Sequence, residues 1–192
     1  MGLKIGFGGV CVDASGTIFT RTTTSISGIM SQQLLVEPVF EEMSSRDLDF
    51  IEDYVAALSV YSILEGLGEV DEELTMLVQS LTNKYIYLLH PLPYYSDIIE
   101  WAGSIKPASL EKIFTVFGED DIYELLGKIV IYKELFDQNS IDSLSVRDLC
   151  ESVERFMKAA GVEPPMWGSE LREKGYRCIT AMGVLLSKIV FG

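Results

Sequence analysis

The stretch Ser145–Gly161, SVRDLCESVERFMKAAG, decides the fold class of this chain. It opens on Ser145-x-x-Asp148, which resembles a capping box, and it closes on Gly161, a residue that commonly follows a helix. Between these ends the apolar residues recur at helical spacing: Val146, Leu149, Cys150, Val153, Phe156, Met157 and Ala160. The spacing predicts an amphipathic helix that covers a core with one face.

The helical period continues on both sides of this stretch. After a loop that contains Pro164 and Pro165, apolar residues from Leu171 to Ile189 predict a closing helix. Before it, the same spacing predicts helices over residues 44–66, 70–90, 94–102, 109–117 and 120–136. We therefore expect a mainly α protein, a compact multi-helix bundle of about six to seven helices.

The first forty residues have a different composition. Glycines at positions 6, 8, 9, 16 and 28 punctuate segments that are rich in Val, Ile, Phe and Thr. Alternating residues 3–7 and the segment 17–22, with turn residues at 13–16 between them, predict an N-terminal β-hairpin. The expected organisation is a hairpin appendage over residues 1–40 and a helical domain with a single core over residues 41–192.

Composition excludes several classes of protein. The 192 residues carry 15 Lys and Arg against 29 Asp and Glu, a net charge of −14, so we expect no direct nucleic-acid binding. No apolar run reaches the roughly 20 residues that cross a bilayer, and the N-terminus lacks the pattern of a signal peptide, so we expect no membrane association. Three cysteines without a C-x-x-C pair fit a reducing compartment and predict a cytoplasmic location.

Most of the negative charge lies in one segment. Twelve acidic residues stand between Glu37 and Glu73 against the single base Arg46, which gives this segment a charge of −11. Two interpretations stay open: a solvated face, or a surface that docks a basic partner. If residues 44–66 and 70–90 form an antiparallel hairpin, the acids near 49–53 and near 71–73 lie about 25–30 Å apart at 1.5 Å per residue. That separation argues against a shared metal ion, and we expect no metal and no cofactor.

The sequence offers few catalytic residues. His90 is the one histidine, so a Ser-His-Asp or Cys-His arrangement would have to use it, and no G-x-S-x-G motif is present. The N-terminal glycines match neither the phosphate loop nor the dinucleotide-binding pattern. We therefore predict no catalytic residues.

Two parts of the sequence resemble known protein families. The segment Val10–Ile18, VCVDASGTI, resembles the strand and D-x-x-G-T motif of haloacid-dehalogenase-type phosphatases, which would make Asp13 the nucleophile. Ser15 stands where that family has its acid/base Asp, and the chain lacks the alternating strands and helices of the family. Segments at 94–99, 125–129 and 144–149 resemble the helical domain of GINS-type replication subunits, which implies a non-catalytic helical member of a complex.

The hypothesis from the sequence is a non-catalytic, acidic, helical subunit for protein–protein interaction or scaffolding in an intracellular complex. The alternatives are an acidic inhibitor or nucleic-acid mimic of viral or mobile-element type, a carboxylate-dependent Mg²⁺ phosphohydrolase, and a small-ligand binder. The partner would be a protein, basic where it meets the acids, and a homo-oligomer stays open. The candidate contact residues are acids and aromatics: Glu41, Glu42, Asp49, Asp53, Tyr94, Tyr95 and Trp167.

Overall fold

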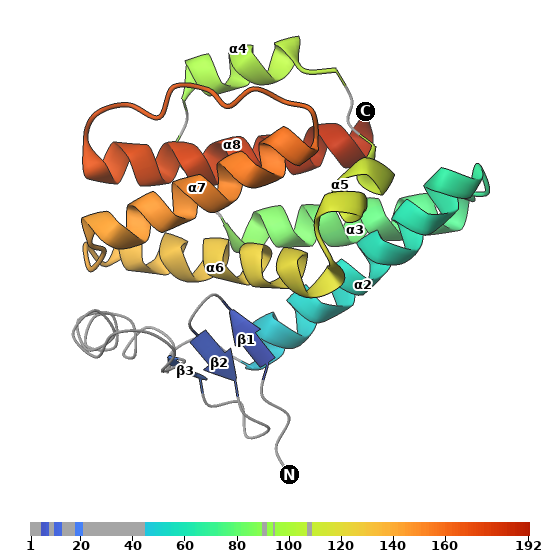
Figure 1. The fold of residues 1–192 in the computed structure, drawn as a ribbon, viewed down its shortest axis with the longest axis horizontal. Helices are drawn as coiled ribbons and strands as arrows, with labels where there is room; N and C mark the ends of the chain where they lie inside the picture. The colour runs from blue at the N-terminus through green and yellow to red at the C-terminus, as the bar shows by residue number, and fades with distance from the viewer. Residues whose placement is uncertain are drawn as a thin grey trace.

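The computed structural model describes the backbone of residues 5–7, 10–12 and 18–20, and then residues 45–89, 92–93, 95–106 and 109–192. Within these residues seven helices pack into an all-α bundle, which confirms the predicted class (Figure 1). The helices are α2 (Ser45–Leu67), α3 (Glu72–Leu88), α4 (Ser96–Ser104), α5 (Leu110–Val116), α6 (Glu119–Asp137), α7 (Ser143–Ala159) and α8 (Leu171–Phe191).

Three short strands precede the helices: β1 (Ile5–Phe7), β2 (Val10–Val12) and β3 (Ile18–Thr20). They are assigned as an antiparallel sheet in the order β1-β2-β3, with Phe7 opposite Val10 and Val12 opposite Ile18. The residues that would connect these strands and join them to α2 lie outside the described part. The predicted hairpin and its status as an appendage therefore stay predictions, as does any role for Asp13.

Aspartates fix the starts of two helices. Asp71 accepts a hydrogen bond from the Leu74 amide at 2.7 Å and begins α3, as expected of an acidic first turn. Asp142 accepts one from the Ser145 amide at 2.7 Å, so α7 begins at Ser143. The prediction that Ser145 starts this helix is wrong by two residues, because the aspartate upstream supplies the cap.

Helices α2 and α3 form an antiparallel hairpin. The Tyr54 and Thr82 hydroxyls lie 2.8 Å apart in the core, and the Tyr54 ring packs against the Tyr85 ring at 5.5 Å. One turn nearer the start of α2, Lys84 Nζ sits 4.1 Å above the Phe50 ring. This pairing places the acids of residues 49–53 and of residues 71–73 at opposite ends of the hairpin, as predicted.

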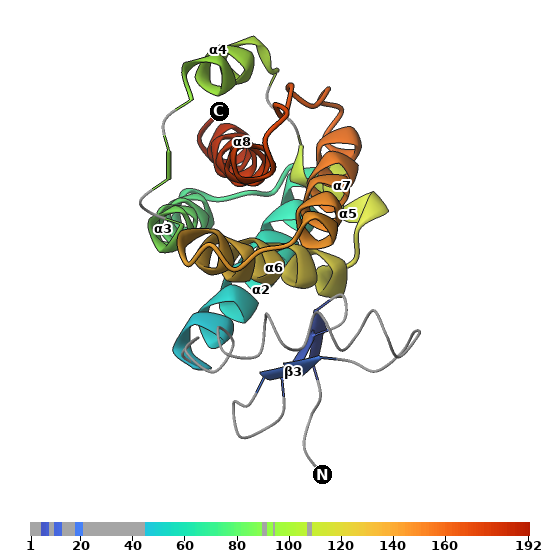
Figure 2. The same cartoon turned by 90° about the vertical axis from the view of Figure 1, so that its left-hand side faces the viewer.

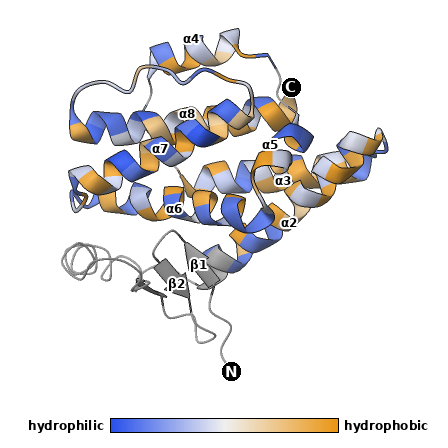
Figure 3. Cartoon of the chain, in the orientation of Figure 1, coloured by the Kyte–Doolittle hydropathy of each residue, from blue (hydrophilic) through white to orange (hydrophobic). Residues whose placement is uncertain are grey.

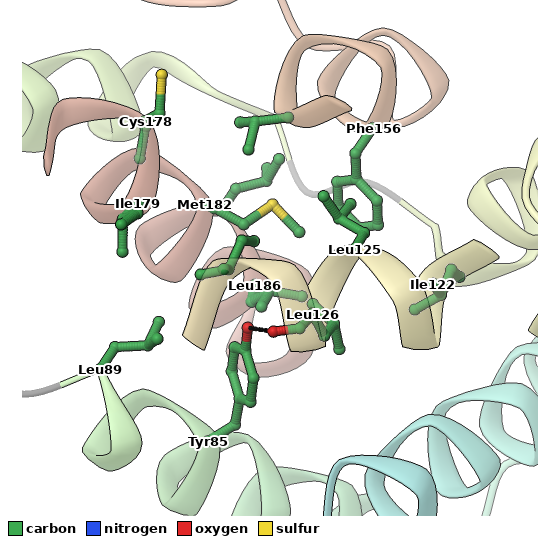
Figure 4. Close-up of a cluster of buried hydrophobic side chains, with 14 of the residues drawn as sticks. Tyr85, Leu89, Ile122, Leu125, Leu126, Phe156, Cys178, Ile179, Met182 and Leu186 are labelled. Atoms are coloured by element: carbon green, nitrogen blue, oxygen red, sulfur yellow. Dashed lines mark hydrogen bonds between the residues drawn. The ribbon is translucent and has the colours of Figure 1, made fainter. Parts of the chain in front are cut away.

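Helix α8 is covered by other helices along most of its length. The buried residues run from Gly175 through Leu186, apart from Val184, and include Val190. Helices α3, α4, α6 and α7 all contact it, and Figure 2 shows it nearly end-on among them. In Figure 4 its Met182 and Leu186 lie near Leu126 of α6 and above Tyr85 of α3, whose hydroxyl donates to the Leu126 carbonyl at 2.8 Å.

The crossing of α6 and α8 depends on a glycine. A Cβ atom built on Gly175 would lie 1.7 Å from Cζ of Phe136, whose ring also packs against Tyr176 at 5.3 Å. Phe136 is fully buried, so it has no open space into which it can turn. The absence of a side chain at Gly175 is therefore what allows the two helices to approach.

The Gly175→Ala variant should lower the free energy of unfolding by about 1–3 kcal/mol or more, because the added methyl group displaces a buried ring. Gly103→Ala in α4 is the matched control: a Cβ there meets nothing within 4 Å, and it should leave stability unchanged or raise it by about 0.5–1 kcal/mol. Chemical denaturation measures both variants. Equal stability of the two variants would show that Phe136 does not pack on Gly175.

A disulfide joins α7 to α8. Cys150 and Cys178 are bonded, with their Cα atoms 5.8 Å apart, and both side chains are buried. The sequence interpretation found no pair among the three cysteines, because these two stand 28 residues apart and meet only when the last two helices pack. The predicted cytoplasmic compartment stays a prediction, and Cys11 has no described side chain.

Reduction of this disulfide should lower the free energy of unfolding by about 2–4 kcal/mol, because the bond restricts the unfolded chain. The thermal midpoint should fall accordingly. The Cys150→Ala/Cys178→Ala variant should show the same midpoint with and without reductant. Calorimetry with parallel thiol titration provides the measurement. If the thiol titration shows that the reductant has released two thiols and the thermal midpoint of the wild type is unchanged, the expectation is contradicted.

None of the described helices is long and apolar enough to cross a membrane.

Candidate interaction surface

Helix α2 has an inner and an outer face. Its inner face is buried against α3, α5 and α6 through Ile51, Tyr54, Val55 and Leu58. The outer face begins with exposed acids and continues with exposed apolar residues. Both faces therefore carry apolar side chains, although only one of them packs on the bundle.

The apolar part of the outer face is a single row of four residues, Ala56, Val60, Ile63 and Leu67, which we call the outer stripe. Steps of four, three and four residues place them along one side of the helix. Val60, Ile63 and Leu67 are 49%, 60% and 65% exposed. Three large apolar side chains in a row on the surface form a patch of the kind that marks interaction sites, unlike single exposed hydrophobic residues.

Acidic residues stand at both ends of the outer stripe. Asp49, Glu52 and Asp53 precede it on the same side of α2, and all three are exposed. After it, the turn into α3 exposes four more acids: Glu69, Asp71, Glu72 and Glu73. The only basic residue in the sequence of α2 is Arg46. The surface is therefore apolar in the middle and negative at each end.

One acid between these groups faces inward. Glu65 Oε2 accepts hydrogen bonds from the Ser109 hydroxyl at 2.9 Å and from the Glu111 amide at 3.0 Å. These bonds fasten the C-terminal half of α2 to the start of α5. They hold the outer stripe on a fixed helix.

Helix α3 adds apolar surface to the same half of the hairpin. Met76 and Leu77 are both about half exposed. Tyr54 of α2 pairs with Thr82 of α3 in this antiparallel hairpin. Val60 follows Tyr54 by six residues, and Met76 precedes Thr82 by six residues. Val60 and Met76 therefore lie at the same level along the hairpin. Figure 1 shows this end of the hairpin projecting beyond the other helices, and Figure 3 shows hydrophobic segments along it.

The structure describes two of the four predicted acidic contact residues. Asp49 and Asp53 are exposed on the outer face of α2. Glu41, Glu42 and Tyr94 lie outside the described residues, as does His90. The acids that bracket the outer stripe thus include two of the four that the sequence singled out.

Tyr95 and Trp167, the two predicted aromatic contacts that the structure describes, serve the packing of α4 and of the loop before α8. Tyr95 is half-buried, with the Arg177 guanidinium 5.0 Å above its ring. Trp167 is only 9% exposed, and its indole N–H donates to Glu154 Oε1 at 2.7 Å. Trp167, which the sequence singled out as a candidate contact residue, is buried in the structure, because the loop that carries it folds back onto α7.

A second group of charged residues lies between α6 and α7, around a hollow of about 250 Å³. Lys128 Nζ lies 3.1 Å from Asp148 Oδ2 and 3.8 Å from Glu124 Oε1, and Arg155 sits over the Phe117 ring. The Lys128–Asp148 pair joins the two helices, whereas the Lys128–Glu124 pair lies within α6 and Arg155 contacts the end of α5. Among the described residues, no three His, Cys, Asp or Glu side chains are grouped so that they could hold a metal ion.

No protein-family model matches this chain, and neither the curated proteins nor the solved structures contain a significant match.

Sequence reasoning missed the outer stripe, although its signal was present. The sequence shows apolar residues on more than one side of α2, a pattern that by itself favours a helix covered on both sides. The row Ala56, Val60, Ile63 and Leu67 could have been found by its four-three-four spacing. The exposure of this row could not have been found from the sequence, because it depends on which other helices cover α2.

The acids at the start of α2 also act on a buried tyrosine of α6. Burial, and then the carboxylates of Glu52 and Asp49, raise the pKa of Tyr123 to about 12. Because the folded state holds this proton more tightly, the contribution of Tyr123 to stability is full below about pH 10 and declines as the pH rises through about 12.

The Asp49→Asn/Glu52→Gln variant should lower the pKa of Tyr123 without returning it to about 10, since burial is the larger cause. Ultraviolet absorbance of tyrosinate, taken as the difference from a Tyr123→Phe variant, follows this titration. A Glu69→Gln/Glu73→Gln variant at the other end of the hairpin is the control and should leave the titration unchanged. An unchanged pKa in the first variant would mean that α2 does not present these acids to α6.

Proposed function

We propose that this protein is a non-catalytic interaction subunit that docks a partner protein on the outer face of α2. The observation that carries the proposal is the outer stripe between two groups of acids. A complementary partner segment is a helix with apolar residues along one side and Lys or Arg near both ends.

The apolar stripe favours a protein partner over the other interpretations. An acidic nucleic-acid mimic needs its carboxylates displayed in a continuous row, whereas Ala56–Leu67 divides the acids of α2 from those of the turn into α3. Apolar side chains of a partner helix would bury the stripe, and that burial supplies most of the affinity. The acids would supply orientation and rate of association, which depend on salt.

Affinity capture with the full-length tagged protein tests the proposal. A Val60→Ser/Ile63→Ser/Leu67→Ser variant should retain about tenfold less of a stoichiometric partner than the wild type, because it removes the apolar anchors. An Asp49→Lys/Asp53→Lys variant should weaken the same interaction mainly at low salt, where charge attraction is least screened. Quantitative mass spectrometry of the retained proteins measures both effects.

Met166→Ser is the matched control. Met166 is 84% exposed and precedes α8, far along the chain from the outer stripe, so its replacement should leave the captured partner unchanged. Circular dichroism checks that all the variants keep their helices. Partners that remain equally bound to the triple serine variant, or the absence of any stoichiometric partner, would contradict the proposal.

A further inference from the structure

A hollow lies apart from the residues of the outer stripe. It measures about 610 Å³ and lies between the end of α4, the start of α5 and the turn that follows α7. Figure 1 shows these three segments near one another in the upper right of the molecule. Its volume falls within the range of about 300–1,000 Å³ that is usual for small-molecule sites.

Part of the wall of this hollow is apolar and aromatic. Trp101 forms one wall, and its indole N–H donates to the Glu163 carbonyl at 2.9 Å, so the ring is held in place. Ala160 and Val162, both buried, contribute apolar surface from the turn after α7. An aromatic or other planar body could pack against the Trp101 ring.

Two lysines line the same hollow. Lys106 and Lys112 are exposed, and neither side chain makes a hydrogen bond or an ion pair with any residue that the structure describes. By contrast, Lys128, Lys133 and Arg177 each pair with a carboxylate. Lys106 and Lys112 thus bring two positive charges without carboxylate partners to the lining of one hollow, in a chain of net charge −14. They provide donors for an anion.

The other polar groups of the hollow are already engaged or opposite in charge. The Ser104 hydroxyl donates to the Trp101 carbonyl at 2.6 Å, and the Ser109 hydroxyl donates to Glu65. Glu163 adds one exposed carboxylate at the rim, which leaves the lysines in excess by one charge. The lysine ammonium groups are therefore the donors left for a ligand.

We propose that this hollow, the Trp101 hollow, binds a small molecule that joins one anionic group to an aromatic body. The ring packs on Trp101 and the apolar turn, and the anionic group lies between Lys106 and Lys112. This site is independent of the outer stripe, so either proposal can fail without the other.

Nuclear magnetic resonance titration of the full chain with 2-naphthoate tests the site. Trp101 and Trp167 are the two tryptophans, so the indole N–H region holds one reporter in the hollow and one buried reference. A Trp101→Phe variant assigns the signals. Saturable movement of the Trp101 signal with a steady Trp167 signal is the expected result.

Charge is tested on the ligand and on the protein. The neutral 2-naphthalenemethanol should bind about tenfold more weakly than 2-naphthoate, and the Lys106→Gln/Lys112→Gln variant should weaken 2-naphthoate by a similar factor. The Arg147→Gln/Lys174→Gln variant removes the same charge outside the hollow and should bind 2-naphthoate as the wild type does. Equal affinity for both probes, equal loss in both double variants, or no saturable movement of the Trp101 signal would overturn the proposal.

Discussion

The arrangement of the bundle depends on the burial of α8. A helix that is covered on nearly every side needs neighbours all round it, and here α3, α4, α6 and α7 supply them. Its polar side chains need partners as well, since an unpaired buried charge is costly. Arg177 meets this need by pairing with Asp97 of α4 and by donating to the Met166 carbonyl at 3.0 Å. The position of α4 and of the loop before α8 follows from that requirement.

The same arrangement explains why α2 keeps an exposed apolar row. The core around α8 is closed without a contribution from the outer face of α2, whose inner face packs on α3, α5 and α6. Residues Val60, Ile63 and Leu67 therefore point away from the bundle. Because the bundle does not need them for its own packing, recognition is the simplest use for them.

Much of the fold could be predicted from the sequence, because helix starts and helical spacing are local properties. Gly161 follows the end of α7 as predicted, and the helix predicted over residues 120–136 is α6. The features that the sequence did not predict depend on contacts between distant segments of the chain. Cys150 meets Cys178, and Trp167 meets Glu154, only through tertiary packing.

The candidate surface was predicted in its charge and missed in its apolar component. Acidic residues are solvated by default, so Asp49 and Asp53 could be placed outside from composition alone. An apolar residue on a helix is by default assigned to the core, and no local signal told Ile63 from Leu58. The distinction lies in which side of α2 the other helices cover.

The acids that bracket the outer stripe also bear on how copies of this protein behave toward one another. Two molecules that met stripe to stripe would bring their carboxylates together, and the repulsion would act over about one Debye length, about 8–10 Å at physiological salt. Charge repulsion, rather than burial, would thus oppose self-association through the apolar row. This repulsion weakens as ionic strength rises. Molecules that carry such an apolar row would therefore stay apart in dilute salt and begin to self-associate in concentrated salt.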